Sequence, residues 1–564
     1  IYNGQIKKVS GWKMGSEDQT THFNSWTLHM KNQSKGICAE LVTASPELPG
    51  SNDQTVVTVR TSEGSFSFLT HDLDHGSIYI PAFSSRITLA SDTSKFVASK
   101  AIIGQTIREK LKVEPEQTFS RASREIPQLS VNMRENGTPL CLPLAADASW
   151  QKFGFEWSGG FYMSRTDTKA KGNEAKRCLW TGDKFIWNIG TGKDPVYQRD
   201  DKNAHMSVLN DYLPVPQVLW HHEGLIFHEE AFATLMEGSL SPDDAGRSEQ
   251  TPAILMMKLD VSNPSSQAKT AHVWLKGSGI DHIQFRDLAI FDRRDGNDYL
   301  RATIKAPDGV TLSSAKLSGG EVELCLEIGP NQSAPLYISF PFVGDLTEKD
   351  KERIVSLDYL SERQRVISYW RDLVDKCVQF NVPEPKFNEM AKSVITHIRM
   401  STTKDPKSGL YMVPAASFYY MVFANESAFQ TIYLDMIGDH KTAANYLETF
   451  LKLQGKAPML GSYSGDQSAV FHGAKVDDVY NYTHQNYNLD HGTVLWALAL
   501  HYLLTGDTEW LNHAAPNMLK AAEWIIEQRN QTKITGNDGT PVLHYGLLPG
   551  GHLEDNSDWG YWFA

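Results

Sequence analysis

The first 345 residues alternate polar and apolar positions in the manner of β-strands. Stretches with a period of two occur at 55–60, 65–68 and 271–275, between clusters of Gly, Pro, Asn, Asp and Ser. This pattern predicts half-buried strands joined by turns. The run at 254–261 and the stretch at 271–275 predict two antiparallel strands joined by a connection of moderate length. We therefore expect a β-sandwich domain over 1–345.

The hydrophobic period changes after residue 345. Charged helix formers dominate 346–384, with apolar residues at helical spacing, and predict a linker helix that packs on a neighbouring surface. The region 385–564 alternates two kinds of helix. The helices at 443–451 and 519–526 have one apolar stripe, whereas 494–504 is apolar almost all round. We expect striped helices outside and apolar helices inside, and hence a multidomain fold of β followed by α.

Three loops rich in polar and aromatic side chains precede helices in this last region. The predicted helices begin near Glu426, Asp490 and Asp558, at separations of 64 and 68 residues, and the third loop runs from Leu548 to Trp562. Each interval contains a loop, an inner helix, a turn and an outer helix. A repeat of this kind brings all of its loops to the same end of the helical domain, around one pocket.

Composition narrows the class of ligand. The 564 residues carry a formal charge of -13 and only short basic runs, which excludes a nucleic-acid surface or a polybasic membrane contact. Apolar runs stay below the roughly 18 residues needed to span a bilayer, so we expect no membrane segment. The 14 Trp and 21 Tyr suit a protein that covers the apolar faces of sugars, although a large sandwich also uses aromatics. A carbohydrate is the expected partner.

Neither a metal nor a cofactor is predicted. The five cysteines are widely spaced without a C-x-x-C motif, which indicates neither a zinc site nor a disulfide framework. Asp292, Asp295 and Asp298 surround Gly296, but their order does not match a calcium loop, and Asp-Gly is a strong hairpin signal. The chain begins at Ile1 without an initiator Met, from which we expect a processed, secreted or periplasmic protein.

The third loop contains adjacent carboxylates, Glu554 and Asp555. Glycoside hydrolysis requires a carboxylic acid that protonates the leaving oxygen, and an inverting enzyme also needs a carboxylate roughly 6.5–9.5 Å away to activate water. The neighbouring charge of Asp555 and partial burial among aromatic residues would favour the protonated form of Glu554. We therefore predict Glu554 as the general acid.

Other polar residues of the loops have structural alternatives. Asp558, Asp490 and Asn425 stand where an N-cap is expected, so capping competes with ligand contact. The loop aromatics compete with core packing. The predicted substrate-binding residues are Tyr419, Tyr420, Glu426, Tyr482, His484, Asn488, Asp490, His491, Asp558, Trp559 and Trp562.

The order of domains and three segments carry a resemblance to a known superfamily. The segments are Glu426 to Gln430, Asn488 to Gly492 and Glu554 to Trp562. With the sandwich and the linker helix they resemble six-hairpin glycosidases, which include glucoamylases, processing α-glucosidases, α-L-rhamnosidases and inverting disaccharide phosphorylases. The resemblance implies that 385–564 is the N-terminal half of an (α/α)6 toroid. It also implies Glu554 as the acid and Asp555 as a ligand of a substrate hydroxyl, with exchanged roles as the alternative.

In the resembling families the catalytic base precedes the last inner helix. We therefore expect it beyond residue 564, either in a missing C-terminal half or in a second chain that completes the toroid. The first hypothesis is an inverting glycoside hydrolase that acts on oligo- or polysaccharides. The alternatives are an inverting phosphorylase, in which phosphate replaces water, and a non-catalytic carbohydrate-binding protein.

Overall fold

The computed structural model describes most of the chain. The described residues are 4–10, 12–19, 24–30, 38–43, 55–61, 64–92, 101–106, 109, 141–164, 184–199, 204–280, 282–294, 296–405, 407–415, 417, 421–475 and 488–551. The chain divides into two compact units, Ile1–Ile126 and Pro127–Ala564.

The described part of the first unit is made mainly of short strands. In antiparallel pairs, β1 (Gly4–Ser10) joins β4 (Cys38–Thr43), β2 (Trp12–Gln19) joins β3 (Asn24–Met30), and β5 (Val56–Thr61) joins β6 (Gly64–Leu69). A three-stranded sheet has the order β8 (Ser85–Ile87), β7 (Ile78–Ile80), β9 (Ile102–Ile103). Phe66, Ile78 and Ile80 form a core of its own. The sequence pattern predicts one β domain over 1–345, whereas this unit forms separately from the sheets that follow.

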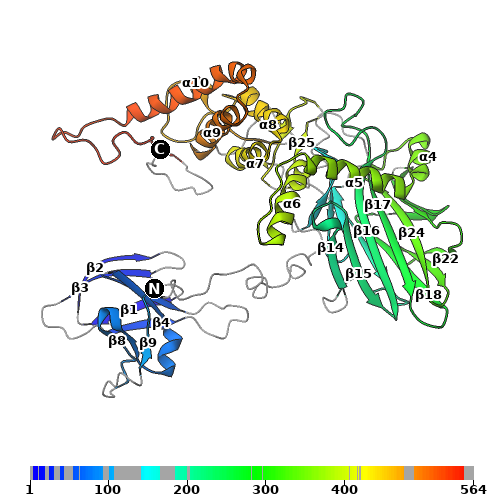
Figure 1. Ribbon diagram of the computed structural model, residues 1–564, viewed down its shortest axis with the longest axis horizontal. Coiled ribbons are helices and arrows are strands. Elements are labelled where there is room, and N and C mark those ends of the chain that lie inside the picture. Colours follow the sequence, from blue (N-terminus) through cyan, green and yellow to red (C-terminus); the bar gives the residue numbers. More distant parts are fainter. Residues whose placement is uncertain are drawn as a thin grey trace. The chain divides into compact units, whose positions relative to one another are not determined.

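Two large antiparallel sheets begin the second unit (Figure 1). The seven-stranded sheet has the order β10 (Leu142–Leu144), β11 (Phe153–Phe155), β12 (Phe161–Ser164), β13 (Lys184–Thr191), β18 (Lys269–Ser278), β23 (Glu321–Ile328), β22 (Thr311–Ser318). The eight-stranded sheet has the order β14 (Ala204–Val208), β15 (Pro216–His222), β16 (Leu225–Leu235), β17 (Ala253–Asn263), β24 (Gln332–Pro341), β21 (Asn297–Lys305), β20 (Ala289–Arg294), β19 (Ile283–Arg286).

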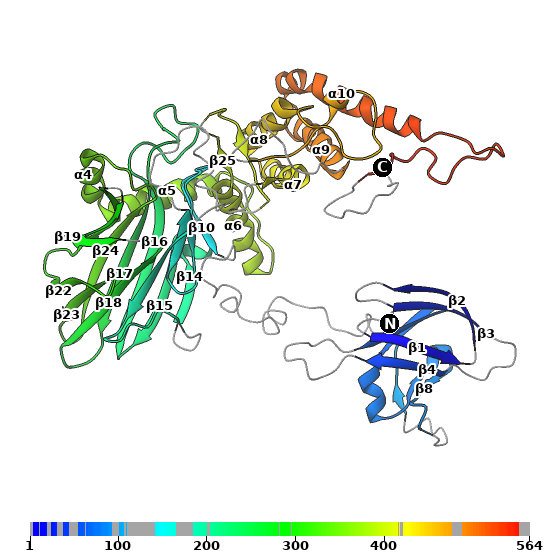
Figure 2. The same cartoon turned by 180° about the vertical axis from the view of Figure 1, so that it is seen from behind.

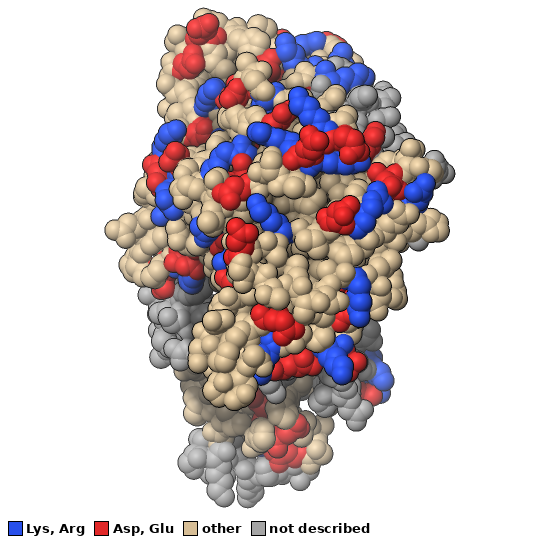
Figure 3. All heavy atoms as spheres, turned by 90° about the vertical axis from the view of Figure 1, so that its right-hand side faces the viewer, with Lys and Arg blue, Asp and Glu red and all other residues tan. Residues whose placement is uncertain are grey.

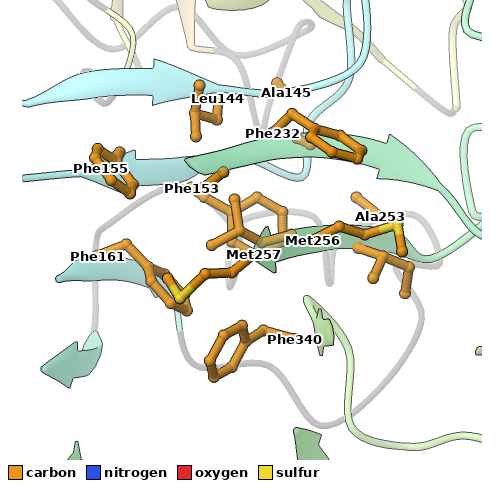
Figure 4. Packing of buried hydrophobic residues seen from close by; sticks show 14 of the residues in the cluster. Leu144, Ala145, Phe153, Phe155, Phe161, Phe232, Ala253, Met256, Met257 and Phe340 are labelled. Carbon is orange, nitrogen blue, oxygen red and sulfur yellow. The ribbon is translucent and has the colours of Figure 1, made fainter. Parts of the chain in front are cut away.

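The two sheets share one apolar core (Figure 4). Phe340 of β24 packs against Phe161 of β12, with ring centroids 4.8 Å apart, and against Trp187 of β13 at 5.1 Å. Met256 and Met257, neighbours on β17, are both buried. A strand covered on both faces needs no polar alternation, which explains the continuous apolar run at 254–257.

Two helices cross the outer face of the eight-stranded sheet, as Figures 1 and 2 show. They are α4 (Glu348–Ser356) and α5 (Tyr359–Asp375). Thr347 and Asp350 form a capping box at the start of α4. The hydroxyl of Tyr359 donates to Glu230 Oε1 of β16 at 2.9 Å, and the Tyr359 ring packs on Phe232. The charged segment after the sheets therefore packs directly on them.

Five further helices follow in sequence. They are α6 (Pro385–Ser401), α7 (Ala424–Met436), α8 (His440–Leu453), α9 (Asn488–Thr505) and α10 (Thr508–Gln531). Two-residue strands pair between them, β25 (Thr403–Lys404) with β26 (Tyr411–Met412) and β27 (Met421–Val422) with β28 (Ala474–Lys475). Short 3-10 helices lie at Thr70–His75, Pro81–Phe83, Leu209–Asp211 and Gln467–Ala469. The helix α9 packs on α7, α8 and α10.

The segment after β10 ties the sheets to the end of α6. The backbone N–H of Ala148 donates to Arg399 O at 3.0 Å, and the N–H of Lys404 donates to Ala148 O at 2.9 Å. The buried ammonium of Lys152 donates to Thr402 O at 3.0 Å. These bonds, together with a core that extends into α6, α7 and α8, join the sheets and the helices into one unit.

Several predictions about individual elements can be compared with this fold. The hairpin at Asp295-Gly296 is confirmed, because β20 and β21 pair antiparallel on either side of it. The pairing of 254–261 with 271–275 is wrong, because β17 pairs with β16 and β24 while β18 pairs with β13 and β23 of the other sheet. The prediction that the apolar stripe at 519–526 is the buried face of α10 is also wrong. Its buried side chains are Ala514, Ala521, Trp524 and Gln528, whereas Leu519 and Ile526 are exposed.

No helix in the described part of the chain is long and apolar enough to cross a membrane. Figure 3 shows one face of the molecule, on which acidic and basic side chains are interspersed.

Candidate functional site

Two of the three predicted loops lead to helices that begin side by side. The N-cap of α7 is Phe423, which makes no side-chain capping bond. Instead, the backbone N–H of Asn425 donates to Asp490 Oδ1, in the first turn of α9, at 2.9 Å. Asp490 is fully buried and Asn425 nearly so. The carboxylate of one helix thus caps the N-terminus of its neighbour, where the helix dipole also favours a negative charge.

This contact corrects the predicted capping. Both helices begin two residues earlier than predicted, at Ala424 and Asn488. Asn425 and Asp490 therefore lie within the first turns of their helices and are not N-caps. Asp490 still caps a helix, but the helix is α7.

The strands before these helices also meet. Val422 of β27 is the register partner of Ala474 of β28, in an antiparallel pair. β27 leads directly into α7, and β28 leads into the segment before α9. The segment that carries β28 therefore pairs with the chain at the end of the helical layer where α7 begins.

The start of the third loop is fixed to the segment 461–463. The backbone N–H of Ser462 donates to Gly550 O at 2.8 Å, and Gly461 and Gly551 form an antiparallel bridge. A Cβ on Gly551 would lie 2.6 Å from Cε2 of Tyr463, closer than real Cβ contacts. Only glycine lets the chain approach the tyrosine ring so closely.

Tyr463 connects the third loop to the second. Nδ2 of Asn488, the first residue of α9, donates to the Tyr463 hydroxyl at 3.2 Å. The Tyr463 ring lies 5.3 Å from that of Trp524 on α10. Oδ1 of Asn488 is buried and has no hydrogen-bond partner in the described structure. It is an acceptor that a ligand hydroxyl would satisfy.

His491 occupies the packing layer between α9 and α10. Its Nδ1 accepts from the Phe471 backbone N–H at 3.0 Å, and its Nε2 lies 3.1 Å from Ala521 O, to which it donates. Burial lowers the pKa of His491 to about 4. The ring is therefore neutral at physiological pH, and these bonds account for both of its nitrogens.

Glu426 lies in the first turn of α7 with an exposed side chain. Of the predicted site residues, the structure thus brings Asn488 and Asp490 to one end of the helical layer, with Glu426 one residue from Asn425. The other predicted site residues lie outside the described residues: Tyr419, Tyr420, Tyr482, His484, Glu554, Asp555, Asp558, Trp559 and Trp562.

The sequence reasoning missed Tyr463 and Gly461, where a Cβ would lie 2.7 Å from Cε2 of the tyrosine. The signal was present in Gly461-Ser462-Tyr463-Ser464-Gly465, an aromatic residue between small residues in a connection between helices. Gly461 and Gly465 both have positive φ, which a glycine adopts without strain. A tyrosine within such a turn is a candidate for contact with another loop.

The acidic residues around Gly296 are engaged with arginines. Asp292 is buried against Arg294 and Arg301, the latter at 3.2 Å, and Asp298 pairs with Arg286 at 2.7 Å. These ion pairs serve the β20–β21 hairpin. Asp295 lies outside the described residues.

Comparison with known proteins gives distant similarities. No protein-family model matches the chain. Over 163 residues, 28% of this chain, it is 22% identical to an uncharacterized glycosyl hydrolase of Methanocaldococcus jannaschii, of which the match covers 25%. The chain thus spans about a quarter of that curated relative.

Two solved structures are similar over larger shares of the chain. A provisionally named kojibiose phosphorylase from human microbiome is 7% identical with a TM-score of 0.39, over 73% of this chain and 59% of that one. A family GH92 α-mannosidase from Bacteroides thetaiotaomicron is 10% identical with a TM-score of 0.28, over 78% of this chain and 68% of that one. These three similar proteins are named as glycoside hydrolases and a glycoside phosphorylase.

Proposed function

We propose that the chain belongs to an enzyme that hydrolyses glycosidic bonds of oligo- or polysaccharides with inversion. Glu554 is the proposed general acid, and Asp555 the proposed ligand of a substrate hydroxyl. The similarity to a protein named as a glycosyl hydrolase supports the class of reaction.

The observation that carries the proposal is a continuous path of contacts between three loops. Asn425 bonds to Asp490, Asn488 bonds to Tyr463, and Tyr463 packs on Gly551. Gly551 is three residues from Glu554 in sequence, and a chain of that length would let the acidic pair reach the α9 N-terminus. A sugar held at this end would meet side chains from all three loops, as binding sites on helical scaffolds require.

The proposed site provides ligands of different kinds. The buried Oδ1 of Asn488 would accept from a sugar hydroxyl, and the exposed Glu426 offers a carboxylate near the α7 N-terminus. The proposed acid would donate its proton to the leaving oxygen as the bond to the sugar breaks. Such general acid catalysis contributes typically 10²–10⁴-fold to the rate.

An exposed apolar face on the inner helices supports a larger helical assembly. Phe429 and Met436 of α7 and Trp496 and Leu503 of α9 are 50% or more exposed, and the Phe429 and Trp496 rings contact each other. Apolar residues grouped in this way mark surfaces that other chain covers. We propose that further helices of an (α/α)6 toroid, from the same or a second polypeptide, cover this face and supply the catalytic base.

The test is Glu554→Gln in the full-length protein, with natural glycosides and an activated aryl glycoside as substrates. We expect a 10²–10⁴-fold loss of kcat on natural glycosides and a smaller loss on the aryl glycoside, whose leaving group needs less protonation. Asp555→Asn should raise KM more than it lowers kcat. Glu523→Gln, at an exposed position on α10, is the matched control and should leave the turnover of both substrates unchanged.

Unchanged turnover of both substrates by Glu554→Gln would refute the assignment of the acid. Product release that depends on inorganic phosphate and yields a sugar 1-phosphate would instead identify a phosphorylase. Tight oligosaccharide binding without turnover by the full-length protein would identify a binding protein.

A further inference from the structure

Three side chains of different chemistry meet on the outer face of the seven-stranded sheet. They are His272 of β18 and Glu323 and Cys325 of β23. His272 and Cys325 are register partners, and Glu323 lies two residues from Cys325 on the same face of its strand. Their ligand atoms all lie within 4.8 Å of one another.

The spacing of these atoms is close to that of zinc ligands. Nδ1 of His272 is 2.9 Å from Glu323 Oε1 and 3.5 Å from Cys325 Sγ, and Sγ is 3.7 Å from Oε1. A point equidistant from the three atoms lies about 2.0 Å from each, and zinc bonds measure about 2.0–2.1 Å to nitrogen, 2.0–2.2 Å to oxygen and 2.3 Å to sulfur. An ion slightly out of the plane of the three atoms would satisfy all three distances.

The surroundings orient the ligands. Nζ of Lys316 lies 3.1 Å from Glu323 Oε2, which leaves Oε1 directed at the histidine. Glu323 and Cys325 are buried, while the His272 side chain keeps 22% of its surface exposed, so an ion has a route from solvent. All three residues stand on strands in the interior of a seven-stranded sheet, which holds them more rigidly than loops would.

We propose that His272, Glu323 and Cys325 bind a zinc ion. The mixture of imidazole, carboxylate and thiolate suits zinc among the common divalent ions, and three protein ligands leave a fourth position for water. On binding, the thiol of Cys325 releases its proton to solvent and the thiolate bonds to the metal. The ion would cross-link β18 and β23, and its role does not depend on the proposed glycosidase site.

The test is metal binding by the full-length chain after treatment with a chelator. With Zn²⁺ and Co²⁺ as probes, we expect one ion per chain, and the Co²⁺ form should show a thiolate-to-cobalt charge-transfer band. Zn²⁺ should also raise the midpoint of thermal unfolding in a concentration-dependent manner, because it binds the folded state.

Variants distinguish metal binding at this site from metal binding by other cysteine thiols of the chain. Cys325→Ser should abolish the charge-transfer band, and His272→Gln should weaken binding of both ions at least tenfold. Cys38→Ser, at an exposed cysteine in the first unit, is the matched control and should bind as the wild type does. Absence of a stoichiometric ion in the wild type, or equal binding by wild type, Cys325→Ser and His272→Gln, would overturn the proposal. Circular dichroism of the metal-free variants checks that they fold.

Discussion

The Asp490 carboxylate accepts a hydrogen bond from the Asn425 backbone N–H across 65 residues of sequence. The bond joins the first turns of α9 and α7, and both residues are buried. It replaces the side-chain cap that α7 lacks. Together with the β27–β28 pair, this buried carboxylate therefore fixes the start of α7 against the start of α9.

Asp490→Ala should leave the Asn425 N–H without an acceptor, at a cost of about 1–3 kcal/mol in the free energy of unfolding. Hydrogen exchange of the Asn425 amide should accelerate, since this bond protects it. Asp490→Asn keeps an oxygen at the position and should show a smaller effect. Asp507→Ala, which removes the side-chain cap of α10, is the control and should leave Asn425 exchange unchanged. Equal exchange in Asp490→Ala and wild type would contradict this role.

The buried ring of His491 predicts acid sensitivity of the helical layer. Its pKa falls from 6.5 in the unfolded chain to about 4 in the folded protein, so below pH 6.5 the unfolded state binds the extra proton. The stabilisation is complete above pH 6.5 and is lost as the pH falls toward 4. The loss amounts to about 3 kcal/mol, at 1.36 kcal/mol per pKa unit.

His491→Gln should flatten the pH dependence of unfolding over this range, because its side chain stays neutral. Burial also lowers the pKa values of His397 and His472, so the useful quantity is the difference between variant and wild type. Denaturant unfolding at several pH values between 4 and 7 measures it. A variant with the same slope as the wild type would show that His491 does not cause the sensitivity.

The guanidinium of Arg399 holds the end of α6 to the sheets. Its Nε donates to Asp147 Oδ2 at 2.8 Å, and its Nη1 donates to Asp439 Oδ2 at 2.7 Å. Arg399→Met should cost about 3–5 kcal/mol, because it leaves buried carboxylate charge uncompensated. Lys441→Met, which breaks an exposed pair with Asp243, should cost less than about 1 kcal/mol. Thermal unfolding of both variants provides the comparison. Equal unfolding midpoints for Arg399→Met and Lys441→Met would show that Arg399 does not stabilise the contact between α6 and the sheets.

Gly551→Ala should displace the start of the third loop. The new Cβ would lie 2.6 Å from Tyr463 Cε2 and 3.0 Å from Leu460 O, so the chain must move. The Ser462 amide, which donates to Gly550 O, should then exchange faster. If Glu554 is the acid, kcat of the full-length protein should fall by up to about 10²-fold, because a misplacement of about 1 Å has that effect. Gly492→Ala, with no atom within 4 Å of its Cβ, is the matched control. Wild-type exchange at Ser462 would show that the loop tolerates the methyl group.

Local pattern predicted the elements better than their contacts. The Asp295-Gly296 signal was sufficient for the β20–β21 hairpin, because a turn of a few residues determines that pairing. The partners of β17 and β18 were not predictable in this way. β17 pairs with β24 and β18 pairs with β13 and β23, all distant in sequence, and the short connection between β17 and β18 passes from one sheet to the other.

The candidate site shows the same division. Asp490 was identified as either a cap or a ligand from its position before an apolar helix. That it caps α7 depends on the packing of two helices. Tyr463 was overlooked because its significance comes from Gly551 and Asn488, which lie far along the chain.

The sequence by itself determined the kinds of element and their order, strands and then helices, because hydrophobic period and turn residues act over a few neighbouring positions. Only the tertiary structure decided that the first 126 residues form a separate unit, and that His272 meets Glu323 and Cys325 more than fifty residues away. The physical reason is that strand register and helix packing follow from the burial of whole faces against distant partners. No local stretch of residues specifies that choice.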